Sequence, residues 1–587
     1  MTDTQRAVLA FVLIALILLL YGPMVRRLSP PQPMEPPPEQ RLLFQPADSL
    51  PPLAAPPPVS RRAVAAPALT PPASAPLVAT AERSFSLETP LYRATISSLG
   101  GGALTYFELK EYQHGSGTGN VQLITDNGAG VNLHLAYINL VGDSIHLTQN
   151  FDILSAPRTE HTYLEEGSLT VAYRYTFPSG SQIIKRLTFH SDRYTVPVSI
   201  EWLYPEREIG PSASTFEIAW PGGLASTERV RKEDEIYSKA YVFQGGELAD
   251  QGKARRGKPV HKNFVGNTDW VALRNKYFAA AFIADPQQPG AFGALRARFE
   301  SVTGTNGKEE AVTRHGMALG YDARRPVSMT LYLGPLSYFI IRDLDVGLQR
   351  IMNLGFSLIR PISTFVLYSL VFLHGYLPNY GVVLILFAVA IRVLTNPLTK
   401  KSAISTQKMQ LVQPRLKELQ AKYKGNQQKL SKETMALWKS EGVNPLGGCL
   451  PILIQLPLLW ALFIVFRTTI ELRGQPFILW VTDLSAPDVV FTLPFSLPLY
   501  GSGVTILALI MGITMFVQQK LSGVSNNPQQ KPMMYMMTGF FFLIFNTFPS
   551  GLNLYYAFSN ILGIFQQRNI RRKLQAGQLG TTGAKSK

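Results

Sequence analysis

The chain has 587 residues but a single cysteine, Cys449. No intrachain disulfide is therefore possible, and the charged N-terminal half must fold without such a cross-link even in an oxidising compartment. Cys449 lies far from the N-terminus, which excludes a lipoprotein signal and indicates a small buried apolar residue. A phosphate-binding Gly-x-x-x-x-Gly-Lys-Ser/Thr loop is also missing, so the sequence gives no sign of an ATP site.

Acidic residues are scarce in the C-terminal third. The chain carries 56 Lys and Arg against 39 Asp and Glu, a net charge of +17. Two clusters hold much of the excess: Lys400–Ser440 has ten basic and two acidic residues, and Arg568–Lys587 has six basic and none acidic. Basic clusters beside membrane spans usually mark the cytoplasmic side. They could also contact anionic lipid or ribosomal RNA.

Changes in composition divide the chain into six regions. Ala7–Tyr21 is apolar and is not followed by a small-x-small cleavage site, which indicates an uncleaved signal-anchor. Sixteen of the 43 prolines lie between Pro30 and Pro76 and predict an extended linker. The predicted regions are an anchor span (1–28), a proline-rich linker (29–83), a β-sandwich domain (84–335), an interfacial helical region (336–376), a five-span core (377–567) with a cytoplasmic helical hairpin (400–441), and a basic tail (568–587).

Short strand patterns broken by Gly and Pro fill residues 84–335. Thr170–Phe177 and Gln182–Phe189 alternate apolar and polar residues on either side of a Pro-Ser-Gly turn, which predicts a β-hairpin. Val327–Leu333 is another predicted strand. Because long helical periods are rare here, we expect an all-β sandwich.

The next segment reads as helical. Seven apolar residues at helical spacing between Ile340 and Leu354 predict an amphipathic helix. Pro361–Leu373 is short for a membrane span, which favours an interfacial or re-entrant helix. Five better candidate spans follow, at Tyr380–Leu398, Pro445–Phe466, Val490–Phe516, Pro532–Phe548 and Gly551–Gln567.

Between the first two of these spans, Lys401–Glu441 carries an apolar stripe that predicts a helical hairpin. The stripe includes Met409, Leu416 and Tyr423 and resumes up to Trp438. With both basic clusters in the cytoplasm, the β-domain lies outside and both termini lie inside. Arg26 and Arg27 flank the first span on its outer side and disagree, but the larger clusters outweigh them.

Arg392 lies alone in an apolar stretch, since no residue from Gly375 to Ile391 is charged. A guanidinium stays protonated in a protein, and placing it in hydrocarbon costs from roughly three to more than ten kcal/mol. The neighbouring spans offer no carboxylate at a similar depth. Two interpretations stay open: a water-filled groove that receives a carboxylate from another protein, or a side chain that snorkels towards Lys400, about 12 Å away at helical rise.

Four motifs in this region resemble, in their order, those of the YidC-type membrane protein insertases. They are Arg392 with Pro397–Lys400; Asn444–Pro457; Glu471–Arg473 with Phe477–Trp480 and Asp483–Ser485; and Phe548–Tyr556 with Ser559 and Asn560. Weaker signals resemble the periplasmic domain of the Gram-negative form of the family, namely Ser98–Gly101, Trp270–Phe278 and Leu331–Pro335. The resemblance implies a polytopic α-helical membrane protein, with an N-terminal anchor, a five-helix insertase core and a periplasmic all-β supersandwich domain.

The resemblance also implies a site. In the family, five core spans enclose a hydrophilic groove that is open to the cytoplasm and to lipid but closed on the outside. The groove residues carried over are Arg392, Gln455, Gln519, Tyr555 and Tyr556. The hairpin stripe of Met409, Leu416, Tyr423 and Trp438 is expected to contact clients or to pack the hairpin. Two positions depart from the family's pattern: Ala388 stands where a Thr is frequent, and Thr547 where a Trp is frequent.

By this resemblance, the chain is expected to be a membrane protein insertase and chaperone of the bacterial inner membrane rather than an enzyme. It would act independently of the Sec translocon or together with it, and no catalytic residue, cofactor or metal is expected. The expected partners are nascent membrane proteins, the Sec translocon with its accessory subunits, the ribosome through the basic tail and hairpin, and membrane lipids.

Two other functions fit parts of the sequence. A membrane-anchored carbohydrate-binding or carbohydrate-modifying protein would use the β-domain, which holds seven of the eight histidines. Only His161 with Glu165 and Glu166 suggests an acid–base cluster there, and this function leaves Arg392 unexplained. A secondary transporter predicts an internal repeat of spans, and the five core spans show none.

Overall fold

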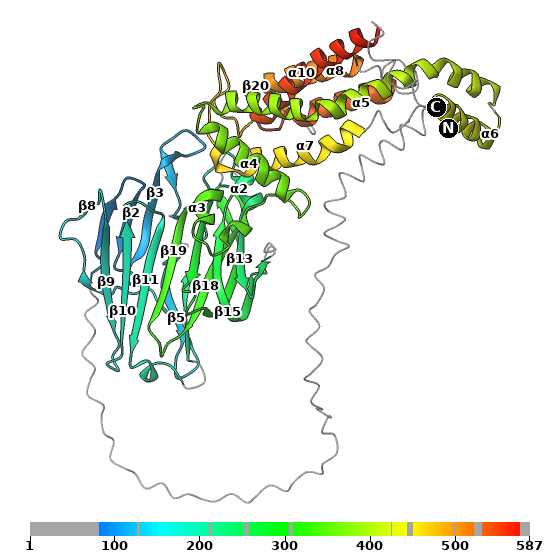
Figure 1. The fold of residues 1–587 in the computed structure, drawn as a ribbon. Helices are drawn as coiled ribbons and strands as arrows, with labels where there is room; N and C mark the ends of the chain where they lie inside the picture. The colour runs from blue at the N-terminus through cyan, green and yellow to red at the C-terminus, as the bar shows by residue number, and fades with distance from the viewer. Residues whose placement is uncertain are drawn as a thin grey trace, which may run out of the picture. The chain divides into compact units, whose positions relative to one another are not determined.

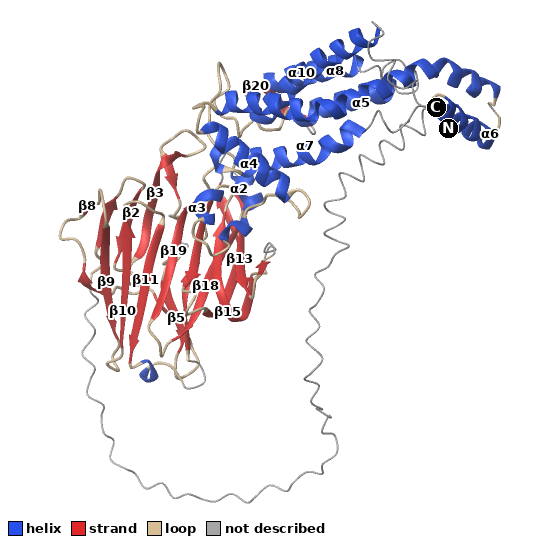
Figure 2. Ribbon diagram, viewed as in Figure 1, coloured by secondary structure: helices blue, strands red, loops and turns tan. Residues whose placement is uncertain are grey.

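The computed structural model describes residues 81–125, 130–210, 214–251, 258–303, 309–423, 425–442, 450–497, 500–521 and 531–575. The predicted anchor span, the predicted linker up to residue 80, Asn444–Cys449 and the tail beyond residue 575 lie outside these ranges. Within them, strands predominate up to Pro335, with the short helix α2 (Arg231–Tyr237) among them, and helices predominate after it (Figure 2). The prediction of a mostly β domain is confirmed.

Two sheets make up the β-domain. Their strands are β1 (Ser84–Glu88), β2 (Tyr92–Ser97), β3 (Ala103–Gln113), β4 (Asn120–Gln122), β5 (His134–Ile138), β6 (Ser144–Leu147), β7 (Asp152–Ser155), β8 (His161–Tyr163), β9 (Ser168–Thr176), β10 (Gln182–His190), β11 (Thr195–Leu203), β12 (Thr215–Trp220), β13 (Lys239–Gln244), β14 (Glu247–Asp250), β15 (Val260–Arg274), β16 (Phe278–Ala284), β17 (Gly290–Thr303), β18 (Glu309–Asp322) and β19 (Val327–Pro335). A five-stranded sheet has the order β4-β3-β2-β1-β8. A 14-stranded sheet has the order β6-β5-β12-β18-β17-β15-β16-β19-β11-β10-β9-β7, with β13 paired to β14 and β15 (Figure 1).

The predicted hairpin is present as β9 and β10, which pair antiparallel from Gln182 opposite Thr176 to His190 opposite Ser168. Burial alternates along β10, so that Ile183, Lys185, Leu187 and Phe189 are buried while every second residue stays partly exposed. This period of two is the pattern of a half-buried strand. The predicted strand at Val327–Leu333 is also present, as β19.

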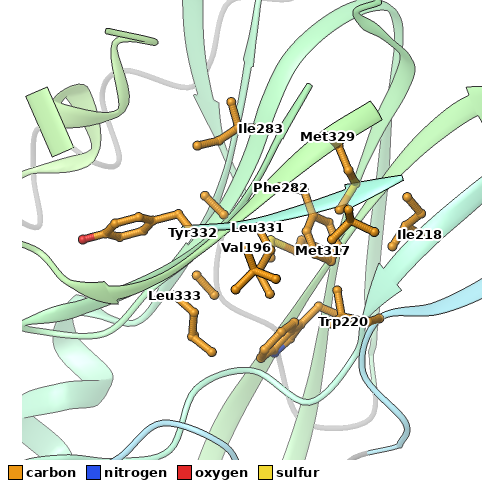
Figure 3. Close-up of a cluster of buried hydrophobic side chains, with 14 of the residues drawn as sticks. Val196, Ile218, Trp220, Phe282, Ile283, Met317, Met329, Leu331, Tyr332 and Leu333 are labelled. Carbon is orange, nitrogen blue, oxygen red and sulfur yellow. The ribbon is translucent and has the colours of Figure 1, made fainter. Parts of the chain in front are cut away.

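One apolar core draws on both sheets. Trp220 of β12, Phe282 of β16, Met317 of β18 and Leu331 of β19 are among the side chains that meet there (Figure 3). Every residue of β16 is buried, as expected for a strand covered on both faces.

Lys185 of β10 is an exception in this core, because its side chain is fully buried. Its Nζ donates hydrogen bonds to the carbonyl oxygens of Gly100 and Leu133. No carboxylate is paired with it in the part of the chain that the structure describes. Burial therefore lowers the pKa of Lys185 to about 7.

The predicted amphipathic helix between Ile340 and Leu354 is wrong as a single element. The chain forms only α3 (Tyr338–Arg342) and a 3₁₀ turn at Leu348–Ile351. Asp345 and Gly347 have positive φ angles of 55° and 74°, which interrupt helical geometry. Most of the apolar residues are nevertheless buried, since Ile341, Leu348 and Ile351 join the core of the β-domain, whereas Ile340 stays exposed.

The helical region contains α4 (Arg360–His374), α5 (Tyr380–Lys422), α6 (Gln427–Ser440), α7 (Leu450–Thr468), α8 (Ile506–Leu521), α9 (Lys531–Phe545) and α10 (Ser550–Gln575). Among the described helices, one stretch, Tyr380–Ser402 of α5, is long and apolar enough to cross a membrane by itself. Gln455–Thr468 and Ile506–Leu521 are shorter apolar helices.

The predicted span at Val490–Phe516 is wrong in its first half. Residues Val489–Leu497 and Gly501–Thr505 form an antiparallel strand pair, β20 and β21, and the helix begins only at Ile506. The run lacks charge, but it is rich in β-branched residues and contains Pro494 inside β20, a combination that favours an edge strand over a helix.

The segment after α7 contacts the β-domain through Arg473. Arg473 Nε lies 2.8 Å from Glu228 Oε1, and both side chains are largely buried. The two terminal nitrogens donate to the carbonyl oxygens of Gln113 and Thr227. Burial raises the pKa of the Glu228 carboxyl despite this ion pair. Because each of the three guanidinium nitrogens donates a hydrogen bond, the contact is specific in geometry.

We expect the stability of the β-domain to rise with pH because of Lys185. Its pKa is about 7 in the folded chain and 10.5 ordinarily, so between these values only the unfolded chain holds the proton, and alkaline pH favours folding. Below pH 7 Lys185 is protonated in both the folded and the unfolded chain, so the free-energy cost of burying its charge no longer changes with pH. The gain between pH 7 and 10 should be of the order of a few kcal/mol relative to Lys185→Met.

Denaturation midpoints of the purified chain, followed by tryptophan fluorescence at several pH values, would measure this difference. Lys262→Met, at an exposed position of β15, should leave the pH dependence as in the wild type. Parallel curves for the wild type and Lys185→Met would contradict the assignment.

Candidate functional site around Arg392

Three helices, α5, α8 and α10, meet near Arg392 in the first half of α5. α10 packs against both α5 and α8 (Figure 1). Asn379 caps the start of α5 by accepting a hydrogen bond from the backbone N–H of Val382. The first turns of α5 are buried on one face, at Val383, Leu384 and Phe387, so this part of α5 belongs to a packed helical core.

Arg392 follows this buried face and points to α8 and α10. A Cβ atom placed on Gly563 of α10 would lie 2.5 Å from Arg392 Nη2 and 2.5 Å from Gln518 Nε2 of α8. The guanidinium therefore points sideways from α5 and lies beside Gly563 of α10 and Gln518 of α8.

The guanidinium has no carboxylate partner within the described ranges, where Arg392 takes part in none of the ion pairs. Its Nε is buried and has no hydrogen-bond acceptor. A buried donor left unsatisfied costs free energy, more so when the group is charged. Arg392 therefore retains an unused capacity to bind an acceptor.

Further polar side chains line the junction of these helices. Asn560 of α10 donates to Thr514 Oγ1 of α8 at 3.4 Å, and Gln566 of α10 donates to Asn396 Oδ1 of α5. The Oε1 atoms of Gln566 and Gln567 are buried without donors. We call Arg392, Asn396, Thr514, Gln518, Asn560 and Gln566 the polar seam.

Of the two glutamines at the end of α8, Gln518 lies beside Arg392 at the face of Gly563. Gln519 instead accepts a hydrogen bond from Thr538 of α9 at 2.9 Å. Gln455 is exposed on α7, and no hydrogen bond found among the described residues joins it to the seam. The expected groove residues are therefore not all brought together.

Tyr555 and Tyr556 belong to the packed helical core, where they are 2% and 8% exposed. Tyr555 packs against Phe387, and Tyr556 packs edge-on against Phe545. The hydroxyl of Tyr556 is buried without a hydrogen-bond partner. In this structure both rings hold helices together.

The predicted helical hairpin is present, but its first arm is the continuation of α5 itself, which runs through Pro397 and Pro414. Met409, Leu416, Tyr423 and Trp438 are each half-buried. Arg415 forms an ion pair with Glu441, which closes the hairpin. Lys422 and Lys429 both lie over the Tyr423 ring, at 5.6 and 5.4 Å.

The two departures from the expected pattern have different settings. Ala388 is buried in the helical core one turn before Arg392, so it adds no polar group there. Thr547 is exposed, and its hydroxyl donates to the carbonyl oxygen of Ile544.

The three residues considered as an acid–base cluster in the β-domain lie at the surface. His161, Glu165 and Glu166 are all exposed. Among the described residues, no group of three or more His, Cys, Asp or Glu could hold a metal ion.

Sequence reasoning did not assign Gln518, Asn560 or Gly563 to the site, although Asn560 belongs to one of the motifs that carry the resemblance. A signal was present, because Tyr556, Asn560, Gly563 and Gln567 follow one another at spacings of four, three and four, and Thr514 and Gln518 are four apart. These spacings place polar and small residues on one face of each helix.

Comparisons with known proteins match the strand-rich part and the helical part of the chain separately. The profile of the family described as the 60Kd inner membrane protein matches residues 372–577, and the profile described as the YidC periplasmic domain matches residues 84–365. A relative named membrane protein insertase YidC, from Chlorobium phaeovibrioides, is 36% identical over 83% of this chain and 82% of its own. The protein of the same name from Chlorobium luteolum is 33% identical over 86% and 85%. A crystal structure described as an active YidC insertase with the first transmembrane domain resolved is 18% identical, with a TM-score of 0.34, over 83% of this chain and 92% of that one.

The buried Tyr556 yields a test of its role. Tyr556→Ala should destabilise the helical core by about 3 kcal/mol or more, because it opens a cavity. Tyr556→Phe should be close to the wild type, because the hydroxyl that it removes has no partner. Thermal unfolding midpoints in detergent compare the three proteins. Equal losses for both variants would mean that the hydroxyl, not the ring, carries the effect.

Proposed function

Because the chain belongs to the YidC family of membrane protein insertases, we propose that Arg392 is the group with which it receives the polar flank of a client transmembrane segment. The observation that carries this proposal is a guanidinium turned across three helices with a buried, unsatisfied Nε. A client carboxylate would supply the acceptor that the described residues do not.

The physical gain lies in the low dielectric of the site. A carboxylate that moves part-way into the bilayer loses its hydration, and a nearby guanidinium offsets part of that loss because charges attract more strongly there than in water. Hydrophobic transfer of the client span then completes the step. For an acidic segment crossing to the outside, the membrane potential contributes about 2.3 kcal/mol per charge per 100 mV.

The polar seam is the proposed groove wall. Its amide groups would bind water while no client is present, since polar groups facing hydrocarbon alone are unfavourable. Gln519 bridges to α9 at one edge of this wall, and Gln455 is exposed on α7. Tyr555 and Tyr556 would act by holding α10 against its neighbours.

The proposed architecture is an N-terminal anchor span, a periplasmic β-supersandwich, and five core spans that contain α5, α7, α8, α9 and α10. The basic segments support a cytoplasmic position for both termini and for the hairpin. In this arrangement the groove opens to the cytoplasm and to lipid.

Partners follow from the same charges. The hairpin presents exposed lysines around its stripe, among them Lys417, Lys422 and Lys432, which suits ribosomal RNA or anionic lipid. Nascent membrane proteins are the clients. We propose that the chain serves them both alone and beside the Sec translocon with its accessory subunits.

Replacing Arg392 should impair clients according to their charge. Arg392→Ala should lower insertion of a single-span client with an acidic flank by about tenfold or more, since a hydrogen bond to a charged group is worth about 1.5–3 kcal/mol. Arg392→Lys should retain part of the activity, because it keeps the charge but loses the planar fork. The measurement is protease protection of the client's outer segment in cells depleted of their own insertase.

A client with the acidic residues replaced by neutral ones is the control and should insert with all three proteins. Full insertion of several acidic clients by Arg392→Ala would refute the proposed role. In that case Arg392 would serve as an anchor, and insertion would depend on the remaining polar groups.

A further inference from the structure

We propose that Gln518 is the second donor of a carboxylate receptor whose first donor is Arg392, and that Gly563 is the positioning residue that leaves room for both. This inference rests on the proposed function and specifies how the site selects its client. The receptor is the meeting point of Arg392 Nη2 and Gln518 Nε2 at the bare face of Gly563.

Gly563 makes α10 less stable than alanine would at the same position. It lies inside α10, and glycine destabilises a helix interior relative to alanine because the unfolded chain is freer. No left-handed φ angle explains it, since Gly563 has helical geometry. This position has no room for a side chain, because a single methyl group would lie 2.5 Å from atoms of two polar side chains.

The other glycines within the long helices differ in what surrounds them. A Cβ on Gly381, Gly512 or Gly551 would meet an aromatic ring, and one on Gly539 would meet nothing within 4 Å. Among these described helical glycines, Gly563 is the one whose added methyl would press on the ends of polar side chains. The bare backbone therefore serves the guanidinium and the amide, not helix packing.

Two donors that meet at one point select an acceptor. The Arg392 guanidinium and the Gln518 amide nitrogen are both hydrogen-bond donors, and neither nitrogen can accept a hydrogen bond. A carboxylate has two acceptor oxygens and could take one bond from each. A cationic or amide flank of a client offers no such pair, so the receptor discriminates by charge.

Gly563→Ala tests the positioning role. The atoms that the methyl group would contact are the far ends of flexible side chains, so the helix should still form and the guanidinium should be displaced. We expect insertion of an acidic-flank client to fall several-fold, insertion of a neutral-flank client to stay at the wild-type level, and the thermal midpoint in detergent to change little. Gly539→Ala, which adds the same methyl in open space, should leave both clients unaffected.

Gln518→Glu tests the receptor directly. The new carboxylate would lie beside Arg392 and occupy its donors, so it should compete with the client's own carboxylate. Insertion of the acidic-flank client should fall to the level of Arg392→Ala, while the neutral-flank client inserts as before.

Two outcomes overturn the receptor. Equal loss for acidic and neutral clients in Gly563→Ala would assign Gly563 to helix packing, and undiminished insertion of acidic clients by Gln518→Glu would remove Gln518 from the site. The proposed function fails separately, when Arg392→Ala itself inserts acidic clients normally. If Arg392→Ala impairs those clients and the other two variants do not, only the receptor is refuted.

Discussion

A guanidinium that has no carboxylate partner among the described residues is the constraint on which the helical region depends. Arg392 cannot lose its proton, so the helices around it must supply polar groups or leave access for water. α8 and α10 do so with amide side chains and with the bare backbone of Gly563. An internal carboxylate would satisfy the charge and also disable it, because a strongly paired cation has nothing left to offer a client.

The parts of the fold that could be predicted are those whose signal is local. The β9–β10 hairpin follows from a period of two on either side of a turn, and its register agrees with that pattern. The helix prediction for Ile340–Leu354 is wrong because apolar spacing indicates which residues are buried and not the backbone geometry. The positive φ angles of Asp345 and Gly347 interrupt the helix. The prediction of a span at Val490–Phe516 is wrong in its first half for a similar reason. Hydropathy indicates whether a segment is apolar, but it does not include the preference of β-branched residues for strands.

The candidate site divides in the same way. Arg392 is visible in the sequence because one charge stands out in an apolar run. Its neighbours are more than 120 residues away, and which of Gln518 and Gln519 faces it depends on the rotation of α8, which no local pattern fixes. Tyr555 and Tyr556 are prominent in sequence for the opposite reason: they are large aromatic residues that pack the core.

The continuity of α5 has a mechanical consequence. A single helix of 43 residues, about 65 Å long at helical rise, carries both the guanidinium and the first arm of the hairpin. A torque applied to the hairpin by a bound partner would be transmitted along α5 to Arg392. Pro397 and Pro414 each remove one backbone hydrogen bond, so α5 has two compliant points, both between the guanidinium and the hairpin tip. Bending would be absorbed there, while the buried first turns of α5 stay fixed.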